Sequence, residues 1–328
     1  KTPPSWSPAG GGWGDDHLPR PKAAAAAARG AVALLLVAAP DSSLPPRASR
    51  PIGSFLEGPG ARLDGFPSLQ VSPEVAAELL AGGGATLPEL WAAIEAARAP
   101  RSRALAAAVT IEVASDYRPA ADGFNLVGVL PGADPALAGE AVVIGAHLDH
   151  VGRQGPDLVF PGANDNASGA AAVLALAEAL AQAPRRPART VVFVLFTGEE
   201  HGLNGARWHV AHPVAPLART VAMLNLDCVA CGDSLQLGNG LSAPNLWRLA
   251  RDLDAAGDRI TVERTWAGGG ADATPFHEAG VPSLYLATTR GYEQLHLSSD
   301  LPATLNGPLY ERVVRLALRT AAAVAGGG

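Results

Sequence analysis

The sequence has little of what would give it a disulfide framework, a nucleic-acid surface or a membrane anchor. Only two cysteines occur, Cys228 and Cys231, so no second cysteine pair exists to complete a structural zinc centre. The formal net charge is −6 and no basic stripe is present, which argues against a nucleic-acid partner. The longest apolar stretch starts at Ala23 and is interrupted by Arg29 and Gly30. It therefore predicts a helix, a turn and a buried strand, and no transmembrane helix is expected.

Three common catalytic motifs are also missing. The chain contains no HExxH helix, no GxSxG elbow and no phosphate-cradling GxxxxGK[ST] loop. These absences argue against a zincin-type metallopeptidase, a serine hydrolase of the α/β type and a P-loop nucleotide hydrolase. Any catalytic chemistry must come from another arrangement of side chains.

The composition supports a large core that is packed mainly by small side chains. Hydrophobic residues make up 48% of the sequence, whereas aromatic residues make up only 5%. The length of 328 residues suggests about two domains. We place them at residues 1–103 and 104–328.

The first region predicts a small α+β unit that ends in a linker helix. Ser72 and Pro73 are typical of a helix start. The stretch GGGATLPELWAAIEAARAPRS, bracketed by glycines and proline, predicts a further helix that bridges the two regions. The other expected elements are helices over residues 21–29 and 73–81 and strands over residues 31–38 and 65–71.

The second region alternates apolar runs with helical patterns. Continuous runs such as VVFVLF and TVAMLNL fit strands that are covered on both faces. The alternation predicts a three-layer α/β/α sandwich with a mixed, mostly parallel sheet. Strands are expected over residues 106–114, 124–130, 141–147, 191–197, 220–226, 259–266 and 281–287, and helices over residues 168–183, 202–211, 242–255, 273–279 and 306–325.

Acids and imidazoles follow or flank the expected strands of this sheet. Because ligands of such folds collect at the carboxyl ends of strands, we expect these side chains to gather at one edge. They are His147 and Asp149 in AVVIGAHLDH, Asp165 in PGANDNASG, Glu199 and Glu200 in FTGEEHG, Asp227 in MLNLDC, and His296 in LHLSSD.

This inventory suits a pair of zinc-like ions. Such a pair needs two neutral imidazoles, a carboxylate that can bridge, and further carboxylates to offset the positive charge. His147 and Asp149 leave the same face of their strand, so Asp149 can orient the ring of His147. Glu199 and Glu200 point in different directions, so one can bind metal while the other acts as a general base. Taken singly, Asp165 would be a helix cap and the two glutamates a solvated helix start.

The order and residue sequence of these segments resemble the zinc aminopeptidase family that includes bacterial leucyl aminopeptidases, glutamate carboxypeptidase and the catalytically inactive transferrin receptor. The resemblance covers roughly residues 104–328 and implies the zinc exopeptidase fold. The stretches that carry it are HLDHVG, GANDNASGAAAVLALAEAL, VVFVLFTGEEHGLNGA, LNLDCV and HLSSD.

The resemblance implies a role for each of these residues. His147 and Asp227 would bind one metal, Glu200 and His296 would bind the other, and Asp165 would bridge them. The implied cofactors are two Zn2+ per chain, with other divalent metals as alternatives.

The same resemblance implies the reaction. The chain would be a dinuclear zinc exopeptidase, foremost an aminopeptidase that removes residues from the amino terminus of peptides. Glu199 would take a proton from a metal-bridging water and return it to the leaving amine, with Asp149 behind His147.

The first region resembles part of a protease-associated domain, an insertion that many of these peptidases carry. The matching text is KAAAAAARGAVALLLV followed by LQVSPEVAAELL. In the family a catalytic segment normally precedes this insertion, so the resemblance implies a chain that is shortened at its start. It also implies a secreted, periplasmic or cell-envelope protein.

Three features depart from the pattern or remain open. A tyrosine stands before the last histidine in several relatives, but Leu295 occupies that place here, and Tyr292 is a substrate-binding candidate or a surface residue. Asp272, in GGGADATPF, is a pocket residue or a helix cap. Cys228 and Cys231 are two reduced thiols or one local disulfide, without a catalytic role.

Other functions are compatible with parts of this pattern. A carboxypeptidase or dipeptidase of the same clan would need a cationic pocket, for which Arg290 is the arginine near the late motifs. A receptor-like binding module on an inactive scaffold would have no need of a complete ligand set. A glutaminyl cyclase shares the fold but uses a single zinc. The preferred side chain and the oligomeric state cannot be predicted from the sequence.

Overall fold

The computed structural model describes residues 19–37, 63, 65–114, 118, 120–154 and 156–326. The chain forms two compact units, Lys1–Ala121 and Asp122–Gly328. Among the described residues, no helix has both the length and the apolar character needed to cross a membrane.

The first unit contains three helices and a two-stranded parallel sheet among its described residues. Helix α1 spans Pro19–Ala27, strands β1 (Leu34–Leu36) and β2 (Ser68–Gln70) pair in parallel, and helices α2 (Pro73–Leu80) and α3 (Leu87–Ala97) follow. Each predicted element of this region is present, although both strands are shorter than expected and residue 38 lies outside the described residues.

Local capping explains where two of these helices begin. The Ser72 hydroxyl accepts a hydrogen bond from the Val75 backbone N–H at 3.3 Å, and Pro73 follows at the first helical position. Thr86 and Glu89 form a capping box at the start of α3, in which each side chain binds the backbone N–H of the other residue.

The prediction of a strand over residues 106–114 is wrong. These residues have no regular secondary structure, and Val109 and Val113 are 50% and 53% exposed. An apolar run becomes a strand only when a neighbouring strand takes up its backbone hydrogen bonds. No strand in the described part of the chain pairs with this segment.

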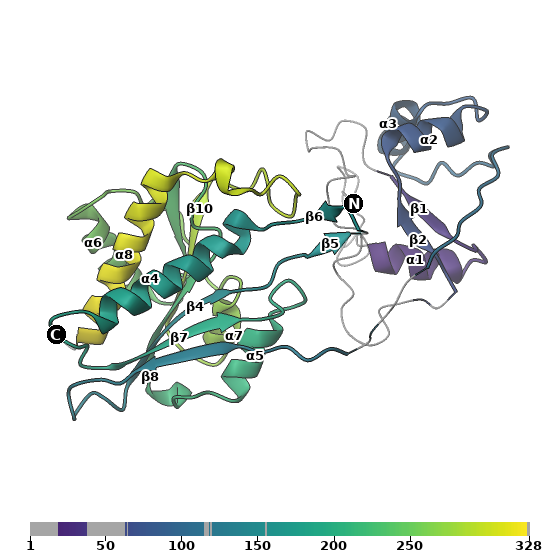
Figure 1. Cartoon of the computed structure of the whole chain (residues 1–328). Coiled ribbons are helices and arrows are strands. Elements are labelled where there is room, and N and C mark those ends of the chain that lie inside the picture. Colours follow the sequence, from purple (N-terminus) through teal and green to yellow (C-terminus); the bar gives the residue numbers. More distant parts are fainter. Residues whose placement is uncertain are drawn as a thin grey trace. The chain divides into compact units, whose positions relative to one another are not determined.

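The second unit is built on a six-stranded mixed sheet (Figure 1). Strands β4, β7, β8 and β10 are parallel, whereas β3 and β9 run antiparallel to their neighbours at the two edges. The mixed, mostly parallel sheet is therefore confirmed. The order across the sheet is β3 (Leu126–Leu130), β7 (Thr190–Phe196), β4 (Ala141–His147), β8 (Thr220–Leu226), β10 (Ser283–Thr289) and β9 (Ser234–Gly238).

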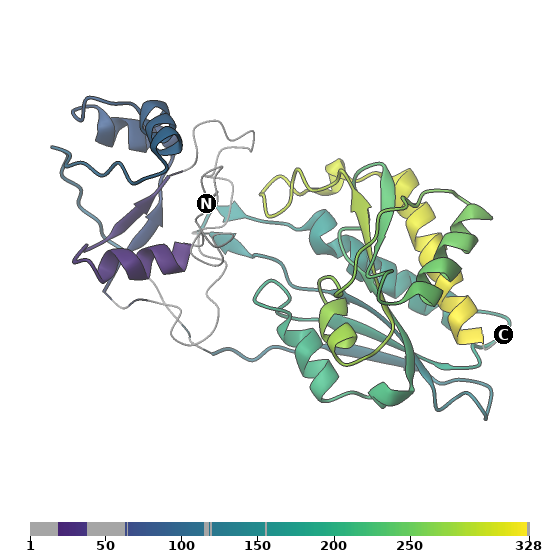
Figure 2. The ribbon, with the colours of Figure 1, turned by 180° about the vertical axis from the view of Figure 1, so that it is seen from behind.

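Helices cover both faces of this sheet, which completes the predicted three layers (Figures 1 and 2). Helices α4 (Gly169–Ala181), α6 (Pro244–Ala255) and α8 (Gly307–Gly326) pack on one face, and α5 (Asn204–Ala211) and α7 (Ala273–Glu278) pack on the other. The larger core lies under the first group and includes Ile144, Leu176 and Leu224. The smaller core lies under α5 and α7, around Phe196 and Phe276.

The far edge of the sheet differs from the prediction. The expected strand over residues 259–266 is reduced to a single bridge between Thr261 and Leu235, and the edge position is taken by β9, which was not predicted. The remaining short elements are strands β5 (Arg153–Gln154) and β6 (Leu158–Val159), the π-helical turn η3 (Ala163–Ser168), and the 3-10 turns η4 (Leu217–Arg219) and η5 (Pro302–Thr304).

Parallel pairing brings the ends of three central strands to one edge. In the β4–β7 register His147 lies beside Phe196, and β8 pairs with β4 on its other side. The chain segments that leave β4, β7 and β8 therefore start from neighbouring points. These segments carry Asp149, Glu199 and Asp227.

Candidate metal centre

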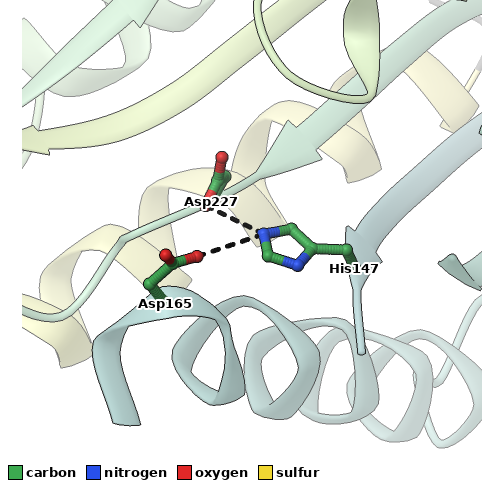
Figure 3. Close-up of side chains that lie close together, drawn as sticks. All are labelled: His147, Asp165 and Asp227. Atoms are coloured by element: carbon green, nitrogen blue, oxygen red, sulfur yellow. Dashed lines mark hydrogen bonds and ion pairs between the residues drawn. The ribbon is translucent and has the colours of Figure 1, made fainter. Parts of the chain in front are cut away.

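Three buried side chains meet at this edge of the sheet. The Nε2 atom of His147, at the end of β4, lies 3.3 Å from Asp165 Oδ1 and 3.4 Å from Asp227 Oδ1 (Figure 3). His147 is 1% exposed, Asp165 4% and Asp227 6%. We call His147, Asp165 and Asp227 the first half-site.

A second group meets the other oxygen of Asp165. The Nε2 atom of His296 lies 3.1 Å from Asp165 Oδ2 and 3.0 Å from Glu200 Oε2. We call Asp165, Glu200 and His296 the second half-site. Asp165 thus offers one carboxylate oxygen to each half-site.

His150 belongs to the same cluster, although the sequence analysis assigned it no role. Its Nδ1 lies 3.0 Å from Glu200 Oε1 and 3.7 Å from Asp165 Oδ2. The signal was present, since His150 ends the HLDH stretch that carries His147 and Asp149. A single imidazole after a strand has no specific meaning until its tertiary neighbours are known.

Asp149 holds the backbone that presents Glu199 and Glu200. Its Oδ1 accepts a hydrogen bond from the Glu199 N–H at 3.1 Å, and its Oδ2 accepts one from the Glu200 N–H at 3.3 Å. The Nδ1 atom of His147 lies 3.0 Å from the Asp149 main-chain oxygen and 3.8 Å from its carboxylate. Asp149 therefore contacts His147 chiefly through its backbone.

The segment that carries Asp165 is held from a distant part of the chain. Asp300 accepts hydrogen bonds from the backbone N–H groups of Asn164 at 2.9 Å and Asp165 at 3.0 Å. The Asn166 side chain donates to the Leu226 carbonyl at 3.0 Å, which ties the same segment to the end of β8. Asp300 lies within the HLSSD motif, but the sequence analysis gave it no function.

Two tyrosines lie beside the first half-site. The hydroxyl of Tyr285, on β10, donates to Asp227 Oδ2 at 3.3 Å, and burial raises the pKa of Tyr285 well above its usual range. Tyr292 is 42% exposed. Tyr292 lies within the electrostatic reach of Asp227 and Asp165.

Asp272 is fully buried at the start of α7. It occupies the cap position, but its side chain makes no capping hydrogen bond, and neither carboxylate oxygen has a partner within the described parts of the chain. Burial raises the pKa of Asp272 well above its usual range, with His147 opposing the shift and Glu199 adding to it. Asp272 therefore lies within the electrostatic reach of the cluster.

The two cysteines take no part in the cluster. Both are free thiols and both are buried. Burial raises the pKa of each thiol, which leaves it protonated and unreactive at neutral pH.

The electrostatics of the cluster favour bound positive charge. Burial lowers the pKa of His147, but hydrogen bonds with Asp165 and Asp227 outweigh burial and raise it far above its usual range. For His296 burial is likewise outweighed, by Asp165 and Glu200, so that its pKa rises to about 10. Burial raises the pKa of Glu199 to about 8. The carboxylates thus hold protons on the imidazoles, and cations could replace those protons.

The donor set and its spacing fit zinc. Two ligands at about 2.0–2.1 Å from a tetrahedral zinc lie about 3.3–3.4 Å apart. The distances of 3.3 and 3.4 Å around His147 Nε2 match this spacing, and those of 3.0 and 3.1 Å around His296 Nε2 are slightly shorter. His147, Asp165 and Asp227 form one group that could hold a cation, and His150, Asp165 and Glu200 form another.

Comparisons with known proteins agree with this geometry. The chain is 30% identical to leupeptin-inactivating enzyme 1 of Streptomyces exfoliatus over 193 residues, 58% of this chain and 42% of that protein. It is 32% identical to aminopeptidase YwaD of Bacillus subtilis over 154 residues, 44% of this chain and 31% of that protein. The chain thus spans less than half the length of these curated relatives.

A solved structure and a family profile are also similar to this chain. The structure of BSAP, a zinc aminopeptidase from Bacillus subtilis, superposes with a TM-score of 0.54 at 24% identity, covering 62% of this chain and 50% of that one. This likeness shows a shared fold. The profile of Peptidase family M28 matches residues 125–321. That match covers more than half of the chain, which therefore belongs to Peptidase family M28.

Proposed function

We propose that the chain is a dinuclear zinc exopeptidase that removes amino-terminal residues from peptides. One observation carries this proposal: the two oxygens of Asp165 face different imidazoles, with Oδ1 3.3 Å from His147 Nε2 and Oδ2 3.1 Å from His296 Nε2. A carboxylate placed in this way can bridge two cations, whereas a mononuclear site would need only one of its oxygens.

The cluster would divide between two zinc ions. His147 and Asp227 would hold one, Glu200 and His296 would hold the other, and Asp165 would contact both. Bound zinc supplies Lewis-acid polarisation of the peptide carbonyl and lowers the pKa of water.

Glu199 is the proton carrier in this proposal. Its backbone is held by Asp149, and its side chain lies within the group formed with His147 and Glu200. A carboxylate at this position can accept a proton from water and release it again. Glu199 would take the proton of the attacking water and deliver it to the leaving amine.

The preference for amino-terminal residues rests on the relatives and on the charge near the site. YwaD and BSAP are aminopeptidases by name. A carboxypeptidase would need a cation for the substrate carboxylate, but Arg290 Nη1 already lies 3.0 Å from Asp233 Oδ2. This pair lines a cavity of about 790 Å³ with Ser234, Gln236, Val262, Arg264, Thr289 and Tyr292.

The test compares substrates and counts metal in the same preparation. Amino-acid arylamides and dipeptides blocked at the amino terminus are assayed side by side, before and after chelator treatment, while zinc per chain is measured by mass spectrometry. We expect two zinc ions per chain, hydrolysis of the free-amine substrates alone, and loss of activity with chelator that zinc restores. Hydrolysis of the blocked dipeptides would support a carboxypeptidase or dipeptidase. Activity that survives complete metal removal would overturn the proposal.

Two wider expectations belong to the same proposal. Residues 1–103 would form part of a protease-associated-like domain and its linker helix, and the helices and short parallel sheet there are compatible with an α+β unit. The natural protein would be exported to the envelope or the medium. Fractionation of the producing cells, with the activity assayed in each fraction, tests the export.

A further inference from the structure

His150 is the third imidazole of the cluster, after His147 and His296, and it lies beside the second half-site. The proposed ligand set does not include it. His150 Nδ1 is 3.0 Å from Glu200 Oε1, and the side chain is only 9% exposed. Its ring meets that of His296 edge to face, with the centroids 5.7 Å apart. His150 therefore faces both residues that would bind the second zinc.

The backbone leaves space for this ring. Gly162 has φ +66°, and a Cβ atom there would lie 2.6 Å from His150 Cγ. A side chain at position 162 would thus be strained by its backbone and would collide with the imidazole. The loop that leads to Asp165 is shaped to fit closely against His150.

The two oxygens of Glu200 have different neighbours. Oε2 lies 3.0 Å from His296 Nε2, on the side of the second half-site, whereas Oε1 lies 3.0 Å from His150 Nδ1. His150 Nδ1 is farther, 3.7 Å, from Asp165 Oδ2, the other oxygen of that half-site. His150 thus contacts the oxygen of Glu200 that points away from His296.

We propose that His150 is a positioning residue for the second zinc. Its Nδ1–H donates to Glu200 Oε1 and would leave Oε2, which faces His296, to bind the zinc. Hydrogen bonds of this kind to a ligating carboxylate orient the ligand and strengthen metal binding. The inference rests on the proposed dinuclear site, since it assigns a function to a neighbour of one of its ligands.

The tautomer follows from this arrangement. An imidazole that donates from Nδ1 while neutral carries its lone pair on Nε2. In the described structure His150 Nε2 is buried and has no hydrogen-bond partner. A buried acceptor without a partner is unfavourable, so packing alone would favour an apolar side chain at this position.

The experiment measures stepwise zinc affinity in three variants. Asn places an amide N–H close to the position of His Nδ1, Leu has nearly the shape of Asn but no donor, and Gln places its amide near the position of Nε2. Chelator-stripped wild type, His150→Asn, His150→Leu and His150→Gln are titrated with zinc by calorimetry and by competition with a chromophoric chelator. Thermal unfolding of each protein establishes that it is folded.

We expect the second zinc to bind about 10- to 100-fold more weakly to His150→Leu and His150→Gln, with the first zinc unchanged. His150→Asn should bind the second zinc with the wild-type affinity, because its amide N–H can replace the donor of His150. The proposal is overturned if all three variants bind both zinc ions like the wild type, or if His150→Asn is as weak as His150→Leu, which would make the ring itself a ligand. A wild type that binds fewer than two zinc ions would instead contradict the dinuclear proposal.

Discussion

The two half-sites are built in different ways. His147 and Asp227 of the first half-site come at the ends of adjacent parallel strands, and their side chains are 1% and 9% exposed. His296 of the second half-site lies in the loop after β10, has a left-handed backbone with φ 55°, and exposes 26% of its side chain. The sheet fixes the first half-site, whereas contacts between loops must fix the second.

This difference has a physical consequence for the supporting residues. Strand backbones are held by the ladder hydrogen bonds of β4 and β8, so His147 and Asp227 need little further support. Glu200 follows β7 in a turn, and its N–H is held by Asp149 and its Oε1 by His150. We therefore expect the first zinc to bind more tightly than the second, and substitutions to separate the two.

Replacing Asp165, which the two half-sites share, should disrupt both half-sites together. In Asp165→Asn one oxygen of the bridge becomes an amide that cannot bind zinc as a carboxylate does. Zinc content should fall from two ions per chain to one or fewer, and kcat/KM should fall on the order of 10⁴-fold or more. Metal analysis and arylamide kinetics measure both.

Asp252→Asn is a matched control, because Asp252 is an exposed residue of α6 and should tolerate the same change. Retention of two tightly bound zinc ions by Asp165→Asn would contradict the bridging role.

Replacing Glu199, the proposed proton carrier, should leave both half-sites intact. Glu199→Gln retains the shape of the side chain but not the basic oxygen. We expect kcat to fall by about two to four orders of magnitude while two zinc ions remain bound with unchanged stepwise affinities. If Glu199→Gln loses zinc instead, Glu199 is a ligand and the assignment of its neighbour Glu200 must be revised.

Tyr285→Phe should affect the first half-site alone. The substitution removes the hydroxyl that donates to Asp227 Oδ2 at 3.3 Å. The first zinc should bind about 10-fold more weakly, which is the lower end of the loss expected when a hydrogen bond to a metal ligand is removed. The affinity for the second zinc should be unchanged. Titration beside His150→Leu would then show that each variant weakens the binding of a different zinc ion. A loss confined to the second zinc would contradict the division into half-sites.

The smallest effect concerns pH and a buried histidine of α5. Burial lowers the pKa of His209, whose ring lies 6.0 Å from that of Phe196 and 5.8 Å from that of Phe276. The unfolded chain therefore binds a proton on His209 more readily than the folded chain. His209 should lower the stability as the pH falls below about 6.5, and it should contribute no pH dependence at higher pH.

Replacing His209 with Phe should remove this part of the acid sensitivity. Urea unfolding of the chelator-treated wild type and of His209→Phe at pH 7.5 and 5.5 measures the difference. An equal loss of stability in both proteins would show that His209 is not the source of the acid sensitivity.

The central sheet could be predicted from sequence because its strands are continuous apolar runs. VVFVLF and TVAMLNL correspond to β7 and β8, buried on both faces. The predictions failed where a strand depends on its neighbour: residues 106–114 have the composition of a strand but no partner strand among the described residues, and SLQLG of β9 forms because β10 provides an edge. Composition alone cannot distinguish these cases.

The residues of the candidate metal site could be predicted from the sequence about as completely as the sheet. His147, Asp165, Glu200, Asp227 and His296 gather as expected. Parallel neighbours deliver His147, Glu200 and Asp227 to one edge, whereas Asp165 reaches it on the turn η3 and His296 on the loop after β10. His150, Tyr285 and Asp300 were missed for a different reason. Each acts through a hydrogen bond to another residue of the cluster, and such a contact leaves no periodic or spacing signal in the sequence.

The hydrogen bonds of Asp300 with the backbone of Asn164 and Asp165 also set an order of events during synthesis. The stretch that contains Asp165 emerges from the ribosome long before Asp300 does. Until the later residue arrives, those two amides lack their acceptor and the shared carboxylate lacks its anchor. Metal loading would thus become productive only after Asp300 has been synthesised, and a chain truncated just before Asp300 would carry every proposed ligand but no stable place for the cations.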